Sequence, residues 1–187
     1  MGRFGESLTE LKLAQELDPV SLEKVGGIGD LFYFQRSYDK AIEQYEKALE
    51  MDPNSGYAHW ALGNVYLHKG MHEQAIVEFK KSIPLSGDSP DEPASLAYAY
   101  AISGKGREAR NILNELQQRS KHSYVSPTLL GFIHEGLGEK DRAFAYLDQA
   151  YRERDFLLIF LKVDPMFDGL RSDPRFSDLM ARVGLPQ

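Results

Sequence analysis

Two histidines in the stretch HKGMH, His68 and His72, are the residues whose type and spacing come closest to metal chemistry. On one continuous helix, histidines four residues apart can bind zinc through their ring nitrogens. Gly70 lies between them where a turn is expected, so the two rings would belong to different helices, and no third ligand stands nearby in the sequence. We therefore predict no metal site.

The stretch GGIGD, residues 26–30, is the segment closest in composition to a phosphate-binding loop. Such a loop follows a strand and ends in Lys followed by Ser or Thr, and both features are missing here. Gly26 and Gly27 are each unfavourable inside a helix by about 1 kcal/mol relative to alanine. We expect them to loosen the first complete helix pair or to open space in a groove, and we predict no nucleotide cofactor.

The charged side chains show no pattern of a reaction centre. Glu43, Glu46 and Glu50 alternate with lysines at helical spacing, which is typical of a solvent-facing helix surface. No serine–histidine–aspartate arrangement can be assembled, and the 187 residues contain no cysteine. The sequence predicts a protein that is not an enzyme, and the lack of cysteine fits a reducing compartment.

The net charge of −6 argues against nucleic-acid binding, because Lys and Arg are interleaved with Asp and Glu instead of forming a basic stripe. The longest strongly apolar run, residues 156–161, is far shorter than the roughly 20 residues that cross a bilayer. The first residues have no apolar core of the kind that signal peptides need. We expect a cytoplasmic protein without membrane contact.

A period of 34 residues runs through most of the chain. Small residues recur at one phase of it: Ser7, Ala41, Ala75, Ala109 and Ala143. Large apolar residues follow four positions later: Leu11, Tyr45, Phe79, Leu113 and Leu147. A turn position, mostly glycine, precedes each set: Gly2, Arg36, Gly70, Gly104 and Gly138. A second small position would let a neighbouring helix approach closely: Gly29, Gly63, Ala97 and Gly131. Each unit therefore predicts two antiparallel helices that must stack on their neighbours.

This pattern predicts a half unit with a helix over residues 4–17, followed by four helix pairs. The pairs are expected at 21–35 and 38–51, 55–69 and 72–84, 91–103 and 105–119, and 125–137 and 139–153. After residue 153 the period stops. Two Asp–Pro steps in the tail, Asp164–Pro165 and Asp173–Pro174, each predict an N-capped helix start. We expect the tail to cover the last exposed face of the array.

The segments AHWALGNVYLHKGMHEQAIVEFKKSI (58–83) and SYDKAIEQYEKALEMDPN (37–54) closely resemble the tetratricopeptide repeat family. The resemblance implies an all-α, right-handed superhelical solenoid of stacked antiparallel helix pairs with a C-terminal helical cap. It divides the chain into a half repeat at 1–20, full repeats at 22–55, 56–89, 90–123 and 124–153, and capping helices at 154–187. The large aromatic usual in the family is displaced to Trp60, and His59 takes its place. The tail also resembles the ends of such arrays in bacterial signalling proteins, where they often follow a winged-helix DNA-binding domain or a Ser/Thr kinase domain.

In this family the first helix of each pair lines a concave groove where ligands lie. Carried onto this chain, the resemblance implies these partner-binding positions: Asp30, Tyr33, Tyr57, Trp60, Asn64, His68, Tyr98 and Phe132. An aromatic-rich groove suits a peptide or helix with apolar anchors, although several of these aromatics could instead pack between repeats. One family subtype clamps a C-terminal carboxylate with basic residues, and none stands at the matching positions here, which disfavours that clamp.

The sequence thus predicts a non-catalytic module that binds a peptide or helix of a partner protein, or another domain of the same polypeptide. The alternative is a structural module that dimerises through the N-terminal half repeat, whose helix carries Leu8, Leu11 and Leu17 with no helix before it. Light scattering across concentration, on the wild type and on a Leu8→Glu, Leu11→Glu variant, distinguishes the two.

Overall fold

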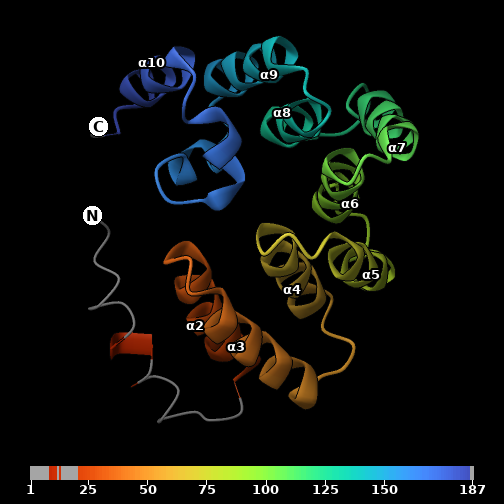
Figure 1. The fold of residues 1–187 in the computed structure, drawn as a ribbon, viewed down its shortest axis with the longest axis vertical. Helices are drawn as coiled ribbons and strands as arrows, with labels where there is room; N and C mark the ends of the chain where they lie inside the picture. The colour runs from red at the N-terminus through yellow and green to blue at the C-terminus, as the bar shows by residue number, and fades with distance from the viewer. Residues whose placement is uncertain (1–8, 12, 14–20, 186–187) are drawn as a thin grey trace. The chain divides into compact units, whose positions relative to one another are not determined.

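The structure is a computed structural model and describes residues 9–11, 13 and 21–185 (Figure 1). Within these residues all regular secondary structure is helical, and there is no strand. The chain divides into two compact units, unit 1 up to Ser89 and unit 2 from Pro90 onward. The boundary lies in the loop between the second and third helix pairs.

Unit 1 consists of two antiparallel helix pairs. The first is α2 (Leu22–Phe34) with α3 (Tyr38–Met51), and the second is α4 (Gly56–His68) with α5 (His72–Ser82), followed by the short 3-10 helix η1 (Ile83–Leu85). Helix α3 also packs against α4, so the two pairs stack. Their shared core contains these buried residues: Ile28, Phe32, Tyr33, Ala41, Tyr45, Ala61, Leu62 and Val65.

Unit 2 repeats this arrangement with α6 (Asp91–Ile102) and α7 (Gly106–Arg119), then α8 (Pro127–Gly136) and α9 (Lys140–Glu153). It ends with two 3-10 helices, η2 (Phe156–Phe160) and η3 (Pro165–Leu170), and the helix α10 (Pro174–Val183). The helices expected between residues 21 and 153 agree with these bounds to within two residues. The all-α class and the antiparallel helix pairs are confirmed, while most of the helix expected at 4–17 lies outside the described residues.

The turn inside each helix pair requires a left-handed residue. Arg36, Gly70, Gly104 and Gly138, spaced by one repeat, have φ angles of 57°, 73°, 80° and 76°. In each turn the next residue donates its N–H back to the helix, as Met71 does to the Tyr66 carbonyl at 2.9 Å. This is the Schellman bond that ends many helices, and it explains the recurring glycine because glycine reaches positive φ without a Cβ clash.

The small residues of the repeat bring the two helices of a pair together. A Cβ added to Gly63 would lie 2.6 Å from the Phe79 ring, and one added to Gly29 would lie 2.5 Å from the Tyr45 ring. Both rings come from the second helix of the same pair and are 0–1% exposed. The predicted close approach at these positions is confirmed for both pairs of unit 1.

The tail retains the repeat length, which corrects the expectation that the period stops after residue 153. The second helices begin at Tyr38, His72, Gly106, Lys140 and Pro174, each 34 residues after the last. The first helix of this final unit would match α8 and cover 161–170, but Pro165 falls inside it. Proline removes a helical N–H and clashes with the preceding turn, so the segment instead restarts as η3 with Asp164 as its N-cap. Both Asp–Pro helix starts are observed as predicted.

Buried Asp155 fixes the start of the tail to the start of α8. Its Oδ2 accepts hydrogen bonds from the Ser126 hydroxyl, from the Thr128 N–H at 3.2 Å and from the Thr128 hydroxyl at 2.9 Å. Its Oδ1 accepts from the Leu157 N–H at 3.0 Å. One carboxylate therefore caps α8 and η2 together, in a chain position where other repeats carry proline, glycine or lysine.

Candidate functional site

Asp30 lies on α2 and is held by two tyrosines from the neighbouring helices. The Tyr45 hydroxyl, on α3, donates to Asp30 Oδ1 at 2.7 Å, and the Tyr57 hydroxyl, on α4, donates to the same oxygen. Burial raises the pKa of the Asp30 carboxyl above its ordinary value, and the two hydrogen bonds oppose this without cancelling it. Burial and the nearby carboxylate raise the pKa values of both phenols, so the tyrosines are neutral donors.

Tyr57 and Trp60 present aromatic surface beside this carboxyl. Tyr57 is 45% exposed although its hydroxyl is bound to Asp30, and its ring centroid lies 6.0 Å from that of the half-buried Trp60. A Cβ on Gly26 would lie 3.0 Å from Tyr57 Cε1, so this glycine leaves room for the ring against α2. The unusual glycine of the first helix is thereby explained. We call Asp30, Tyr45, Tyr57 and Trp60 the Asp30 site.

The other groove positions expected in unit 1 are more enclosed. Tyr33 is 7% exposed and belongs to the hydrophobic core, and its ring lies 5.6 Å from that of His68. Asn64 is 5% exposed and its side-chain amide donates to the Trp60 carbonyl at 3.2 Å. The structure therefore links Asp30 to Tyr57 and Tyr57 to Trp60, while Tyr33 and Asn64 are buried.

In unit 2 the expected positions Tyr98 and Phe132 are also enclosed, with 8% and 6% exposure. Their ring centroids are 6.4 Å apart, and Phe132 continues to Phe167 at 4.8 Å. These rings form an aromatic row along α6, α8 and η3. Its members contact one another instead of opening to solvent.

Glu135, on α8 in unit 2, is a second enclosed acid, and the sequence did not predict it. Burial raises the pKa of its carboxyl, with Tyr98 and Lys140 acting in the opposite direction, and burial also raises the pKa of the Tyr98 phenol. A Cβ on Gly169 would overlap Glu135 Oε1, so the carboxylate lies directly against η3. The available signal in the sequence is a charged residue at a repeat position that carries Tyr33, Leu67 and Ala101 elsewhere.

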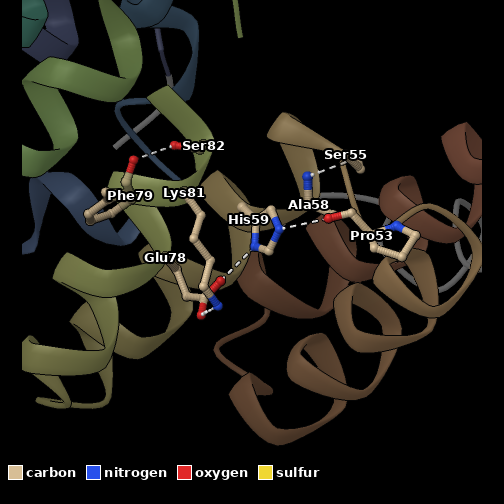
Figure 2. Close-up of polar contacts among 8 residues, drawn as sticks. All are labelled: Pro53, Ser55, Ala58, His59, Glu78, Phe79, Lys81 and Ser82. Carbon is tan, nitrogen blue, oxygen red and sulfur yellow. Dashed lines mark hydrogen bonds and ion pairs between the residues drawn. The ribbon is translucent and has the colours of Figure 1, made fainter. Parts of the chain in front are cut away.

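His59 forms a buried polar contact within the second helix pair (Figure 2). Its Nδ1 lies 2.7 Å from Glu78 Oε2 on α5, and its Nε2 lies 3.1 Å from the Pro53 carbonyl oxygen. Lys81 Nζ contacts the other Glu78 oxygen at 2.7 Å. A carbonyl oxygen only accepts, so the hydrogen bond to Pro53 requires a hydrogen on His59 Nε2. This contact joins α4, the helix that also carries Tyr57 and Trp60, to α5 and to the preceding loop.

The expected self-association edge is described only in part. Leu11 packs against the core of unit 1, whereas Leu8 and Leu17 lie outside the described residues, so self-association through this edge stays a prediction. In the described part of the chain, no group of three or more His, Asp and Glu side chains is arranged to hold a metal ion. No helix among those residues has the length and apolar character needed to cross a membrane.

Residues 29–70 match the family described as TPR repeat, and residues 57–88 match the family described as Tetratricopeptide repeat. Over residues 29–88 the chain is therefore similar to tetratricopeptide repeats. The matched residues contain α3, α4 and α5 completely and the end of α2, and they include all four residues of the Asp30 site. No curated protein matches the chain in sequence.

Solved structures with this fold cover nearly the whole chain. The structure of the APC/C hetero-tetramer Cut9–Hcn1 is similar with a TM-score of 0.69 at 14% identity, covering 97% of this chain and 36% of that chain. The thermophilic TPR protein TTC0263 of Thermus thermophilus has a TM-score of 0.66 at 16% identity, covering 98% and 92%. YrrB, described as a TPR protein with an unusual peptide-binding site, has a TM-score of 0.55 at 17% identity, covering 92% and 89%. These similarities establish the tetratricopeptide repeat solenoid as the fold.

Proposed function

We propose that this tetratricopeptide repeat protein is a non-catalytic module that binds a peptide or helix of a partner protein on its first helices. The observation that carries the proposal is the grouping of half-exposed Tyr57 and Trp60 beside the Asp30 carboxyl. Large aromatics with a polar group at hand are the residues that dominate binding energy at protein interfaces. The partner is either a separate protein or another domain of the same polypeptide.

The solved relative YrrB supports this proposal by its description as a TPR protein with a peptide-binding site. At the same time the enclosed rings of Tyr33, Tyr98 and Phe132 narrow the proposed contact surface to the exposed part of unit 1. We therefore place the main peptide contacts on α2 and α4. Within unit 1, Tyr33 and Asn64 are buried and stabilise those helices.

The test is binding of a defined peptide library to the wild type and to Trp60→Ala. We expect Trp60→Ala to lose peptide binding while helical circular dichroism and the melting temperature stay near wild type, because the ring is only half-buried. Val77→Ala is the matched control, since Val77 is 50% exposed on the second helix α5. If Trp60→Ala unfolds the protein, or if Val77→Ala weakens binding equally, the proposed surface is wrong.

A further inference from the structure

We propose that the Asp30 site binds a cationic side chain, Lys or Arg, of a bound peptide, so that the module selects basic segments. The inference rests on the proposed function and names the chemistry of the ligand. It starts from the carboxyl itself. Asp30 receives two neutral phenol donors and, in the described part of the chain, no ion pair with a Lys, Arg or His side chain.

A half-buried carboxylate without a cation is costly for the folded protein. The two phenols donate to the same oxygen, Oδ1, and they orient the carboxyl without neutralising it. A guanidinium or ammonium group that reached the carboxyl would supply the missing charge and form a charge-assisted hydrogen bond, which is stronger than a neutral one. The Asp30 carboxylate therefore lacks a positively charged partner that a ligand could supply.

The surroundings of the carboxyl suit the same ligand. The exposed Tyr57 ring and the adjacent Trp60 ring offer aromatic faces, which attract Lys and Arg through cation–π interactions and cover their apolar stems. Tyr57 connects the carboxyl to the aromatic surface, because its hydroxyl donates to Asp30 while its ring lies beside that of Trp60. The two phenol donors are already used by Asp30, which leaves them unavailable to an acidic or amide side chain.

The distribution of charge over the repeats points the same way. Among the first helices α2, α4, α6 and α8, Lys24 is the single Lys or Arg in the sequence, while five acids occur on them: Glu23, Asp30, Asp91, Glu92 and Glu135. The second helices α3, α5, α7 and α9 instead carry Lys and Arg in nearly equal number to their acids. The net charge of −6 is therefore unevenly placed, and the proposed ligand-binding helices are the negative ones.

The experiment uses the full chain and pools of short peptides with blocked ends. One central position is fixed as Lys, Arg, norleucine, Gln or Glu, and the other positions vary. We expect the Lys and Arg pools to bind more tightly than the norleucine pool, and Asp30→Asn to weaken those pools about tenfold to a hundredfold, the range of a charged hydrogen bond. Glu43→Gln, which removes one charge from an exposed position of α3, should leave binding unchanged.

A second measurement needs no variant. We expect the indole N–H signal of Trp60, the only tryptophan, to shift saturably in nuclear magnetic resonance spectra when ethylguanidinium chloride is added, and not with equal sodium chloride. Equal responses to the two salts, or an unchanged Lys and Arg preference in Asp30→Asn, would overturn the inference. Pools that bind without charge preference refute only the cation site, whereas pools that do not bind at all refute the proposed function as well.

Discussion

The buried contact between His59 and Glu78 should be one of the strongest single stabilising interactions in unit 1. The two side chains are 10% and 11% exposed and 2.7 Å apart, and each has one further partner. Replacing His59 by alanine leaves the Glu78 carboxylate enclosed with only Lys81, which is 51% exposed. Breaking a buried, hydrogen-bonded pair from one side costs about 3–5 kcal/mol. Because Lys81 remains, we expect the low end of that range, about 3 kcal/mol, for His59→Ala.

A double-mutant cycle measures the interaction itself. His59→Ala, Glu78→Ala and the double variant are unfolded with urea, and Trp60 fluorescence reports unit 1 because it is the only tryptophan and lies on the same helix. A hydrogen bond to a charged group contributes about 1.5–3 kcal/mol. The loss in free energy of unfolding of the double variant should therefore be smaller than the sum of the two single losses by that amount.

The control is the ion pair of Lys69 with Asp39, which joins the two helix pairs of unit 1. Asp39 is 84% exposed, and exposed pairs typically couple by less than about 1 kcal/mol. A His59–Glu78 coupling no larger than this control would refute the reasoning, because it would mean that enclosure and the double contact of the imidazole add nothing. The single losses would then reflect lost packing volume alone.

Three other contacts give predictions of their own. Gly63→Ala should lower the free energy of unfolding by about 1–3 kcal/mol, because the new Cβ clashes with the Phe79 ring. The control Gly106→Ala should be tolerated, because its Cβ would have its nearest neighbour at 3.8 Å. Urea titration of both variants measures the difference. Asp155→Ala leaves buried donors without their acceptor and should cost about 3 kcal/mol or more, measured by thermal melting of the full chain. Asp30→Asn should flatten the pH dependence of stability. Because the pKa of Asp30 is raised in the folded state, the wild type loses stability as pH rises from 3.8 through the folded pKa. A variant that still shows this loss contradicts the assignment of the pH dependence to Asp30.

Much of the fold could be predicted from the sequence because the repeat fixes local geometry. Gly70 predicts a turn since the backbone there needs positive φ, and Gly63 predicts close helix packing since a ring fills the space above it. Such requirements act within one helix pair and recur with each repeat. The tail departs from the prediction for a related reason. The tail no longer has the residue types of the repeat, so comparison of residues does not reveal its period. The 34-residue spacing is nevertheless kept, because α10 begins at Pro174, 34 residues after the start of α9.

The polar contacts could not be predicted in the same way. Glu78 lies 19 residues after His59, and Tyr57 lies 27 after Asp30, so each pair meets only when two helices are packed in register. No periodicity of the sequence encodes those partners, because neither pair recurs in the other repeats. The aromatic groove positions are similarly ambiguous, since an aromatic at a repeat position fits both a core and a binding surface, and only the exposure in the folded chain separates Tyr57 from Tyr33.

Asp30 also shows how the needs of stability and of binding can be separated in a repeat protein. The same repeat position carries Asn64, Tyr98 and Phe132, so the scaffold packs there without a carboxyl. Because burial raises the pKa of Asp30, the ionised group makes the folded state less stable at neutral pH than a neutral side chain would. Replacing a residue that serves only the fold should make the protein less stable. We expect the opposite for Asp30→Asn, a higher melting temperature at neutral pH together with weaker binding of Lys and Arg peptides, because a cation on the partner supplies the charge that the fold itself does not.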